Sequence, residues 1–165
     1  MKITSVVGIL IVLMGCAVPA QADEGKPDAG QVVAAAPELH KGDYWVYRRG
    51  TGATFKRQDL LFAKELEFPL WVGKTWAFEQ WRSPKLMTVD MRAEVLNFRP
   101  VAVVAGTFDA YEIRYECNAR GPFRQTSCGS WTRWYAPQVG NIIATKAYST
   151  KTTWELIEFK RFPAQ

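Results

Sequence analysis

Two cysteines in the body of the chain have the type and spacing for covalent chemistry. Cys117 and Cys128 are separated by the ten residues NARGPFRQTS. An oxidising compartment joins such a pair, and closing a loop of this length stabilises the fold by about 3 kcal/mol through lost chain entropy. Two free thiols are the alternative. Because His40 is the only histidine, the four ligands of a zinc site are not supplied. We therefore predict a disulfide across a hairpin, and no metal or other cofactor.

Residues arranged for catalysis are few. The sequence contains no Gly-x-Ser-x-Gly elbow, no phosphate-binding loop and no His-Glu-x-x-His helix. Glu65 and Glu67 could form the carboxylate pair of a glycoside hydrolase, but their alternation in KELEF favours a solvated face. We expect no catalytic residues and a protein that binds rather than catalyses. The alternative is a hydrolase or other enzyme acting on envelope polymer or carbohydrate.

The first 22 residues are typical of an export signal. Lys2 is followed by the apolar stretch ITSVVGILIVLMG and then by CAVPAQA, a pattern too short for a stable membrane span. Cleavage after Ala22 would follow the small residues of AQA. Alternatively, LMGC resembles the bacterial lipoprotein box, so that residues 1–15 are removed and Cys16 becomes the lipidated first residue. Both interpretations predict export, to the periplasm or as a lipoprotein anchored in the outer membrane.

Composition divides the rest of the chain in two. Residues 23–41 are rich in Ala, Gly, Pro and acids, which predicts a flexible tether. All seven tryptophans lie beyond it, so we assign residues 42–165 to one β-domain. The net charge of +5 is scattered among acids rather than clustered. Nucleic acid is therefore not an expected partner, and the membrane is reached only through the N-terminal lipid anchor.

Alternation with a period of two predicts the elements of this domain. In TFDAYEIRYEC (107–117) and LMTVDMRAEV (86–95), apolar and polar residues alternate, as in strands with one wet face. Shorter β-branched and aromatic runs predict strands at 43–49, 74–81, 130–136, 141–149 and 152–160. Only residues 57–68 have a helical pattern. The sequence therefore predicts an all-β fold.

Two glycines mark corners between these strands. In VAVVAGTFDAYEI (101–113), Gly106 separates an apolar run from the alternating strand, where a residue tolerant of positive φ allows a turn or bulge. In WYAPQVGNII, Pro137 fixes φ at a turn and Gly140 can take a left-handed conformation. We expect both glycines to serve folding rather than ligand contact.

Four blocks occur in the order and spacing of a large, functionally uncharacterised family of exported bacterial β-domains. They are FPLWVGKTW (68–76), VAGTFDAYEI (104–113), WYAPQVGNI (134–142) and WELIEF (154–159). They resemble the family patterns PL.VGK.W, VPAGTF.A..I, WYAP.VG.V and L..Y, with Val104 in place of the usual proline. The resemblance implies a single antiparallel, strongly curved sheet or open barrel, similar in outline to the half-barrels of periplasmic lipoprotein carriers. It implies no particular activity.

The apolar strand faces suggest a binding surface. We expect no helix long enough to cover them, so they must close on themselves, pack on a partner or hold a ligand. The candidate ligand-lining residues are Met87, Val89, Met91, Tyr111, Ile113 and Tyr115, with Trp71 and Trp134 at the rim. The expected partner is a lipid or other apolar ligand, or an envelope protein. A core filled by its own side chains is the alternative.

Overall fold

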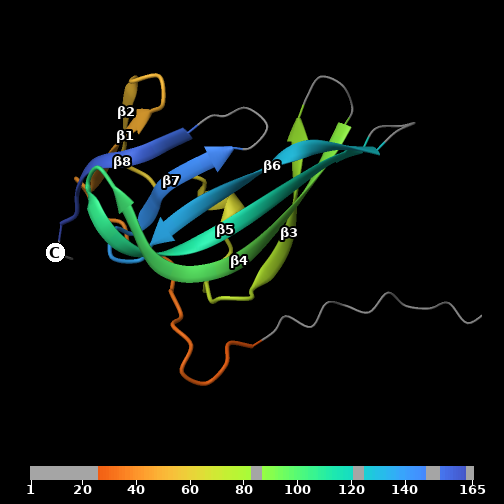
Figure 1. The fold of residues 1–165 in the computed structure, drawn as a ribbon, viewed down its shortest axis with the longest axis horizontal. Helices are drawn as coiled ribbons and strands as arrows, with labels where there is room; N and C mark the ends of the chain where they lie inside the picture. The colour runs from red at the N-terminus through yellow and green to blue at the C-terminus, as the bar shows by residue number, and fades with distance from the viewer. Residues whose placement is uncertain (1–25, 83–86, 121–124, 148–152, 163–165) are drawn as a thin grey trace, which may run out of the picture.

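The computed structural model describes residues 26–82, 87–120, 125–147 and 153–162. They form eight strands and one short 3-10 helix, η1 (Ala63–Glu65) (Figure 1). The strands are β1 (Tyr44–Arg49), β2 (Thr54–Arg57), β3 (Thr75–Arg82), β4 (Met87–Val103), β5 (Gly106–Arg120), β6 (Gln125–Ala136), β7 (Asn141–Ala147) and β8 (Thr153–Lys160). The predicted signal peptide, Cys16 and both candidate cleavage sites lie outside the described residues.

All eight strands belong to one antiparallel sheet, in the order β2-β1-β8-β7-β6-β5-β4-β3. β3 to β8 follow one another as a meander, and β1 pairs with the last strand. β2 and β3 are the two edges, so the sheet is not closed. Figure 1 shows the long strands β4 and β5 curving around the core. The prediction of an all-β fold built on one antiparallel, curved sheet is confirmed.

Every expected strand is present, but β4, β5 and β6 are longer than the sequence pattern indicated, and β6 has 12 residues. β4 has 17 residues and β5 has 15, and a register shift between Val95 and Asn97 bends the hairpin that they form. Such a bulge adds one residue to a strand and increases its local twist. β2 was not expected, since its four residues, TFKR, contain a single apolar side chain. The segment 57–68 contains only η1, so its helical pattern does not become an α-helix.

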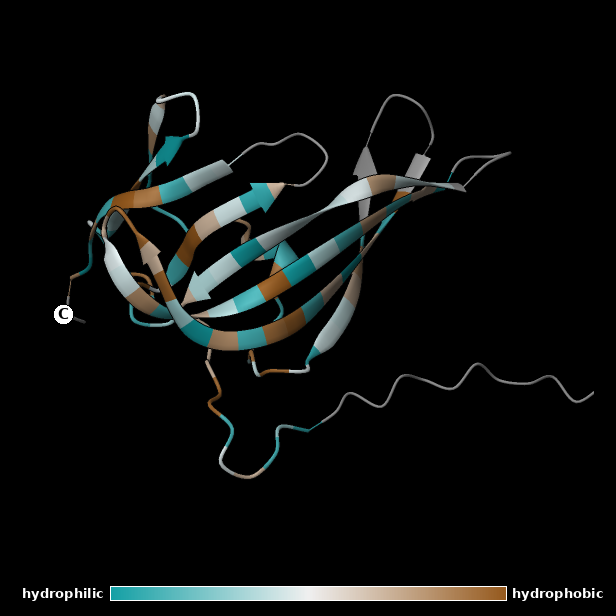
Figure 2. Ribbon diagram, viewed as in Figure 1, coloured by the Kyte–Doolittle hydropathy of each residue, from teal (hydrophilic) through white to brown (hydrophobic). Residues whose placement is uncertain are grey.

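The concave face of the sheet carries the core. Along β5, Ile113 and Tyr115 are fully buried on this face, whereas Arg114 and Glu116 are exposed on the outer face. Figure 2 shows the same alternation of hydrophobic and hydrophilic residues along β4 and β5. This is the pattern of an antiparallel sheet with one packed face.

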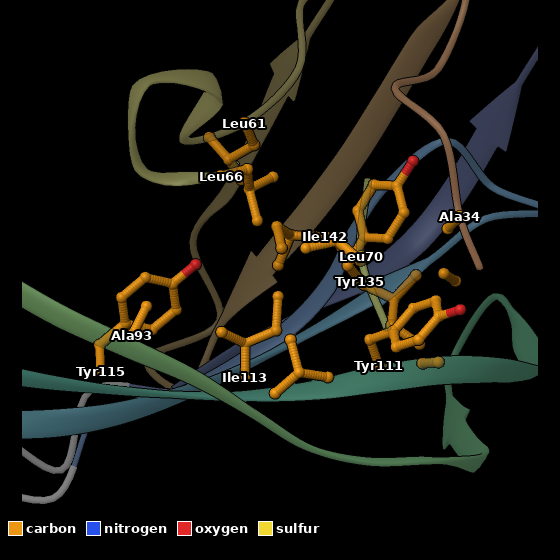
Figure 3. Close-up of a cluster of buried hydrophobic side chains, with 14 of the residues drawn as sticks. Ala34, Leu61, Leu66, Leu70, Ala93, Tyr111, Ile113, Tyr115, Tyr135 and Ile142 are labelled. Carbon is orange, nitrogen blue, oxygen red and sulfur yellow. The ribbon is translucent and has the colours of Figure 1, made fainter. Parts of the chain in front are cut away.

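A loop segment, residues 58–74 between β2 and β3, covers this concave face. We call it the cover segment. Its Leu61 and Leu66 are buried, and Figure 3 shows them facing Ile113 and Ile142 of the sheet. The core is therefore completed by a loop rather than by a second sheet or a helix.

The tip of the β4–β5 hairpin folds against β8. The backbone N–H of Ala105 donates to the carbonyl of Leu156 at 3.1 Å, and the Phe108 ring meets Phe159 edge-on with centroids 5.7 Å apart. Gly106 lies at this tip with φ of +141°, so the predicted glycine corner is confirmed.

Gly106→Val should lower the free energy of unfolding by at least about 1 kcal/mol, because a β-branched residue is strained at positive φ. A Cβ atom at this position would also lie only 3.2 Å from Cζ of Phe108. Urea unfolding measures the change, with Thr107→Val on the exposed neighbouring position as the control. An unchanged midpoint for Gly106→Val would show that the corner tolerates a side chain.

Asp43 joins the beginning and the end of the domain. Its carboxylate accepts hydrogen bonds from the backbone N–H of His40 at 2.9 Å and of Phe162 at 2.7 Å, and Arg161 Nε lies 3.8 Å away. Burial raises the pKa of Asp43, but these two hydrogen bonds and the charge of Arg161 together outweigh burial and leave the pKa below its ordinary value of 3.8.

The lowered pKa makes the contribution of Asp43 depend on pH. A carboxylate with a depressed folded-state pKa stabilises the fold above its unfolded pKa, and this stabilisation is lost as pH falls through the folded pKa. Asp43→Asn should therefore be less stable than the wild type at about pH 7, and the difference should shrink at about pH 2. Urea unfolding at both pH values checks this. A difference that does not change with pH would contradict the role assigned to the charge.

Residues 26–41, which composition predicts to be tether, make specific contacts. Ala34 is buried and forms an antiparallel bridge with Leu70 of the cover segment. Gln31 Nε2 donates to the carbonyl of Val72 at 2.7 Å. This stretch is therefore attached to the loop that completes the core.

Candidate functional site

The structure brings most of the predicted ligand-lining residues together on the concave face. Val89, Met91, Tyr111, Ile113 and Tyr115 are all at most 4% exposed. The side chain of Met87 lies outside the described residues. The five described residues form part of one core cluster that also contains Leu61 and Leu66 of the cover segment. A ligand could reach them only if the cover segment moved, so their role as a lining stays a prediction.

The two tryptophans expected at a rim are both half-buried. Trp71 is half-buried, and Lys74 Nζ lies 4.8 Å from its ring centroid. Trp134 is also half-buried and is paired directly across from Glu112 in the β5–β6 ladder. Directly paired residues share a face, so Trp134 is on the outer face, opposite Tyr111 and Ile113. Trp134 therefore does not line the concave face, and a rim position for Trp71 stays a prediction.

A buried ion pair lies beneath the cover segment. Arg133 of β6 points to the concave face, and its Nη1 donates to Glu65 Oε2 at 2.5 Å. The side chains of Arg133 and Glu65 are 6% and 15% exposed. Charged side chains are rarely buried unless they are paired, so each one determines the position of the other.

Aromatic rings enclose the guanidinium of Arg133. Its Cζ lies 3.4 Å from the ring centroid of Phe62, 4.7 Å from that of Tyr115 and 5.5 Å from that of Trp131. The electron-rich faces of aromatic rings attract a cation, most strongly where water is excluded. The site is thus one cation in an apolar and aromatic surrounding.

Several buried polar atoms around Arg133 lack a protein hydrogen-bond partner. They are Arg133 Nε, Trp131 Nε1 and Thr145 Oγ1. Thr145 is paired directly across from Arg133 in the β6–β7 ladder, and Trp131 is two residues away on the same strand. Most buried polar groups in proteins are satisfied. This place therefore has more hydrogen-bond donors than acceptors.

Two tyrosines at the concave face act as donors. Burial raises the pKa of the Tyr115 phenol, more than the nearby charge of Arg133 lowers it. The Tyr115 hydroxyl lies 3.4 Å from the backbone carbonyl of Glu65, and the Tyr111 hydroxyl donates to that of Val32 at 2.8 Å. Both hydroxyls therefore contact backbone carbonyls of segments that pack on the concave face.

The two carboxylates of KELEF contact different cations. Glu65 binds Arg133, whereas Glu67 lies 3.3 Å from Nζ of the buried Lys74. Each carboxylate is therefore neutralised by its own cation. The expectation that both lie on a solvated face is wrong for Glu65, because its side chain is largely buried against Arg133.

The sequence contained a signal for Arg133. In SWTRWYA, Trp131, Arg133 and Tyr135 share one strand face, so a charged residue interrupts an apolar face. A charge at a core position needs a partner, and Glu65 is distant in sequence. The pairing became visible only with the cover segment in place.

An open cleft of about 570 Å³ is lined by parts of β1, β7 and β8, including Thr145 and Trp154, and Thr145 is the residue paired across from Arg133. Its lining includes Ala102 and Val103 of the hairpin tip, Ala144 of β7, and the exposed Arg48–Glu155 ion pair, whose atoms are 2.8 Å apart. Arg48, Glu155 and Ala144 are paired in one row across β1, β8 and β7.

Cys117 and Cys128 form the predicted disulfide, with Cα atoms 5.1 Å apart. The bond joins β5 to β6 beside a register shift between Cys117 and Asn118.

Across the described parts of the chain, no three His, Cys, Asp or Glu side chains are grouped to hold a metal ion. In the same residues, no helix has the length and hydropathy needed to cross a membrane.

No protein-family model and no curated protein matches the chain. Two solved structures are similar in part. A candidate lipoprotein from Parabacteroides distasonis has 14% identity and a TM-score of 0.48, over 77% of this chain and 99% of that one. A candidate exported protein with a YmcC-like fold from Bacteroides fragilis has 13% identity and a TM-score of 0.42, over 78% of this chain and 100% of that one. The family suggested by the four sequence blocks stays a prediction.

Proposed function

We propose that this protein is an exported domain of the cell envelope that binds an apolar ligand and does not catalyse a reaction. The observation that carries the binding role is the concave face, which is apolar and is covered by a loop. Loops open at lower free energy than the strands of a sheet, so a loop-covered face can be exposed without unfolding the sheet.

Two features support export. The N-terminal sequence has the pattern of a signal peptide, and Cys117 and Cys128 are joined in a disulfide. Disulfides persist in oxidising compartments such as the periplasm.

The charged groups buried at the concave face, Arg133 and Glu65, neutralise each other, which suits a structural or binding role.

Expression of the whole sequence, followed by fractionation and N-terminal mass analysis, tests export. We expect a processed chain outside the cytoplasm. If Cys16 is lipidated, the wild type fractionates with membranes and Cys16→Ser does not; if cleavage follows Ala22, both are soluble in the periplasm. A hydrophobic fluorescent probe titrated into the folded protein tests the binding role. An unprocessed cytoplasmic chain would contradict export, and the absence of saturable probe binding would contradict the binding role.

A further inference from the structure

The cover segment itself has the chemistry of a ligand for the concave face. It presents three buried aliphatic side chains, those of Leu61, Leu66 and Leu70, together with the carboxylate of Glu65, which binds Arg133. We propose that Arg133 is a binding site for the carboxylate of an apolar ligand, which replaces Glu65 at this position. The inference rests on the proposed binding function and specifies the class of ligand.

The hydrogen bonds of Arg133 leave room for a better acceptor. Glu65 is bonded to Nη1 only, and Nε of Arg133 has no protein partner. A free carboxylate can accept from a guanidinium through both oxygens in a bidentate pair, which is stronger and more directional than a single bond. Trp131 Nε1 and Thr145 Oγ1 are two further donors on the adjacent strand positions. A ligand carboxylate could therefore satisfy groups that Glu65 leaves unpaired.

The aromatic enclosure makes the site selective for an anion. Because Phe62, Tyr115 and Trp131 exclude water from the guanidinium, a ligand without a negative charge would leave a buried cation unpaired. An alcohol of the same length should then be rejected, since specificity often depends on such an uncompensated group. Exchange of Glu65 for a ligand carboxylate keeps the charge balanced.

The contacts of the cover segment allow this exchange. Phe62 has φ of +62°, a left-handed conformation that is strained for a bulky residue. Asn141 holds the segment through two hydrogen bonds, from the Leu61 N–H at 3.0 Å and to the Asp59 carbonyl at 3.1 Å. Glu65 is partly exposed and so connects the buried pair to solvent. Leu61, Leu66 and Leu70 of the segment are also buried against the sheet, and the Phe62 and Phe68 rings pack on Trp154 and Tyr135.

Calorimetric titration with laurate and with dodecanol tests the inference on protein purified from cells expressing the whole sequence. The variants are Glu65→Gln, the neutral double variant Glu65→Gln/Arg133→Met, and Glu112→Gln, which removes an equal charge paired with Arg99 on the outer face. We expect Glu65→Gln to bind laurate roughly tenfold or more tightly than the wild type, because the competing carboxylate is gone. Glu112→Gln should match the wild type. The double variant should lose the preference for laurate over dodecanol.

Three results would overturn the inference: equal laurate affinity for Glu65→Gln and the wild type, a double variant that still prefers laurate, or no laurate binding by any variant. Dodecanol binding distinguishes failure of the carboxylate site from failure of the proposed binding function. If both compounds bind, and their affinities do not depend on Glu65 or Arg133, the carboxylate site is ruled out but the domain still binds apolar ligands. If neither compound binds, the binding function fails as well. The double variant carries no unpaired buried charge, so it remains informative if Glu65→Gln is unstable.

Discussion

Arg133→Met should lower the free energy of unfolding by about 3 kcal/mol, because it leaves the Glu65 carboxylate under the cover segment without its cation. Methionine fills much of the same volume among Phe62, Tyr115 and Trp131, so the expected loss comes from the uncompensated charge rather than from a cavity. Urea unfolding followed by tryptophan fluorescence measures the change.

A double-mutant cycle separates charge from packing. Glu65→Gln/Arg133→Met should regain most of the lost stability, since a buried ion pair replaced by neutral groups is often nearly neutral in free energy. Arg99→Met, which breaks an exposed pair with Glu112 on the outer face, should cost at most about 1 kcal/mol. If the double variant is as unstable as Arg133→Met alone, the guanidinium stabilises the domain through packing and not through its charge.

Replacement of both body cysteines should also have a large effect. Cys117→Ala/Cys128→Ala should lower the free energy of unfolding by about 2–3 kcal/mol, because the unfolded chain regains the entropy of an open loop between residues 117 and 128. Chemical denaturation of the oxidised wild type and of the double variant measures the difference. Added reductant should destabilise the wild type and leave the variant unchanged. If Cys117 and Cys128 both react as free thiols in the denatured, unreduced wild type, the predicted disulfide is contradicted.

Strands such as β1, β5 and β8 could be predicted because buried and more exposed residues alternate along them. In β5, Tyr111, Ile113 and Tyr115 alternate with charged residues, and this period of two identifies both the strand and its inner side. β2 escaped prediction because a four-residue edge strand has almost no pattern. The bend in the β4–β5 hairpin depends on a register shift, which is a property of two paired strands and not of either sequence alone.

The candidate site was predictable only in part. Alternation identifies Val89, Met91 and Ile113 as one apolar face, but it does not show what covers that face. The cover is a loop whose placement depends on contacts distant in sequence, such as Asn141 with Leu61 and Arg133 with Glu65. Local pattern cannot pair residues that are about seventy positions apart, so the ion pair emerged only from the fold.

Native mass spectrometry of the protein purified from its own envelope fraction shows directly whether the folded domain carries a bound ligand. We expect a non-covalent apolar ligand bound to the folded chain at one copy per protein, released on denaturation, with a mass and fragmentation that show a carboxylate. A denatured sample provides the covalent mass, which separates any lipid on Cys16 from the bound ligand. A folded protein whose native mass equals its covalent mass would contradict the claim that this envelope domain functions by binding.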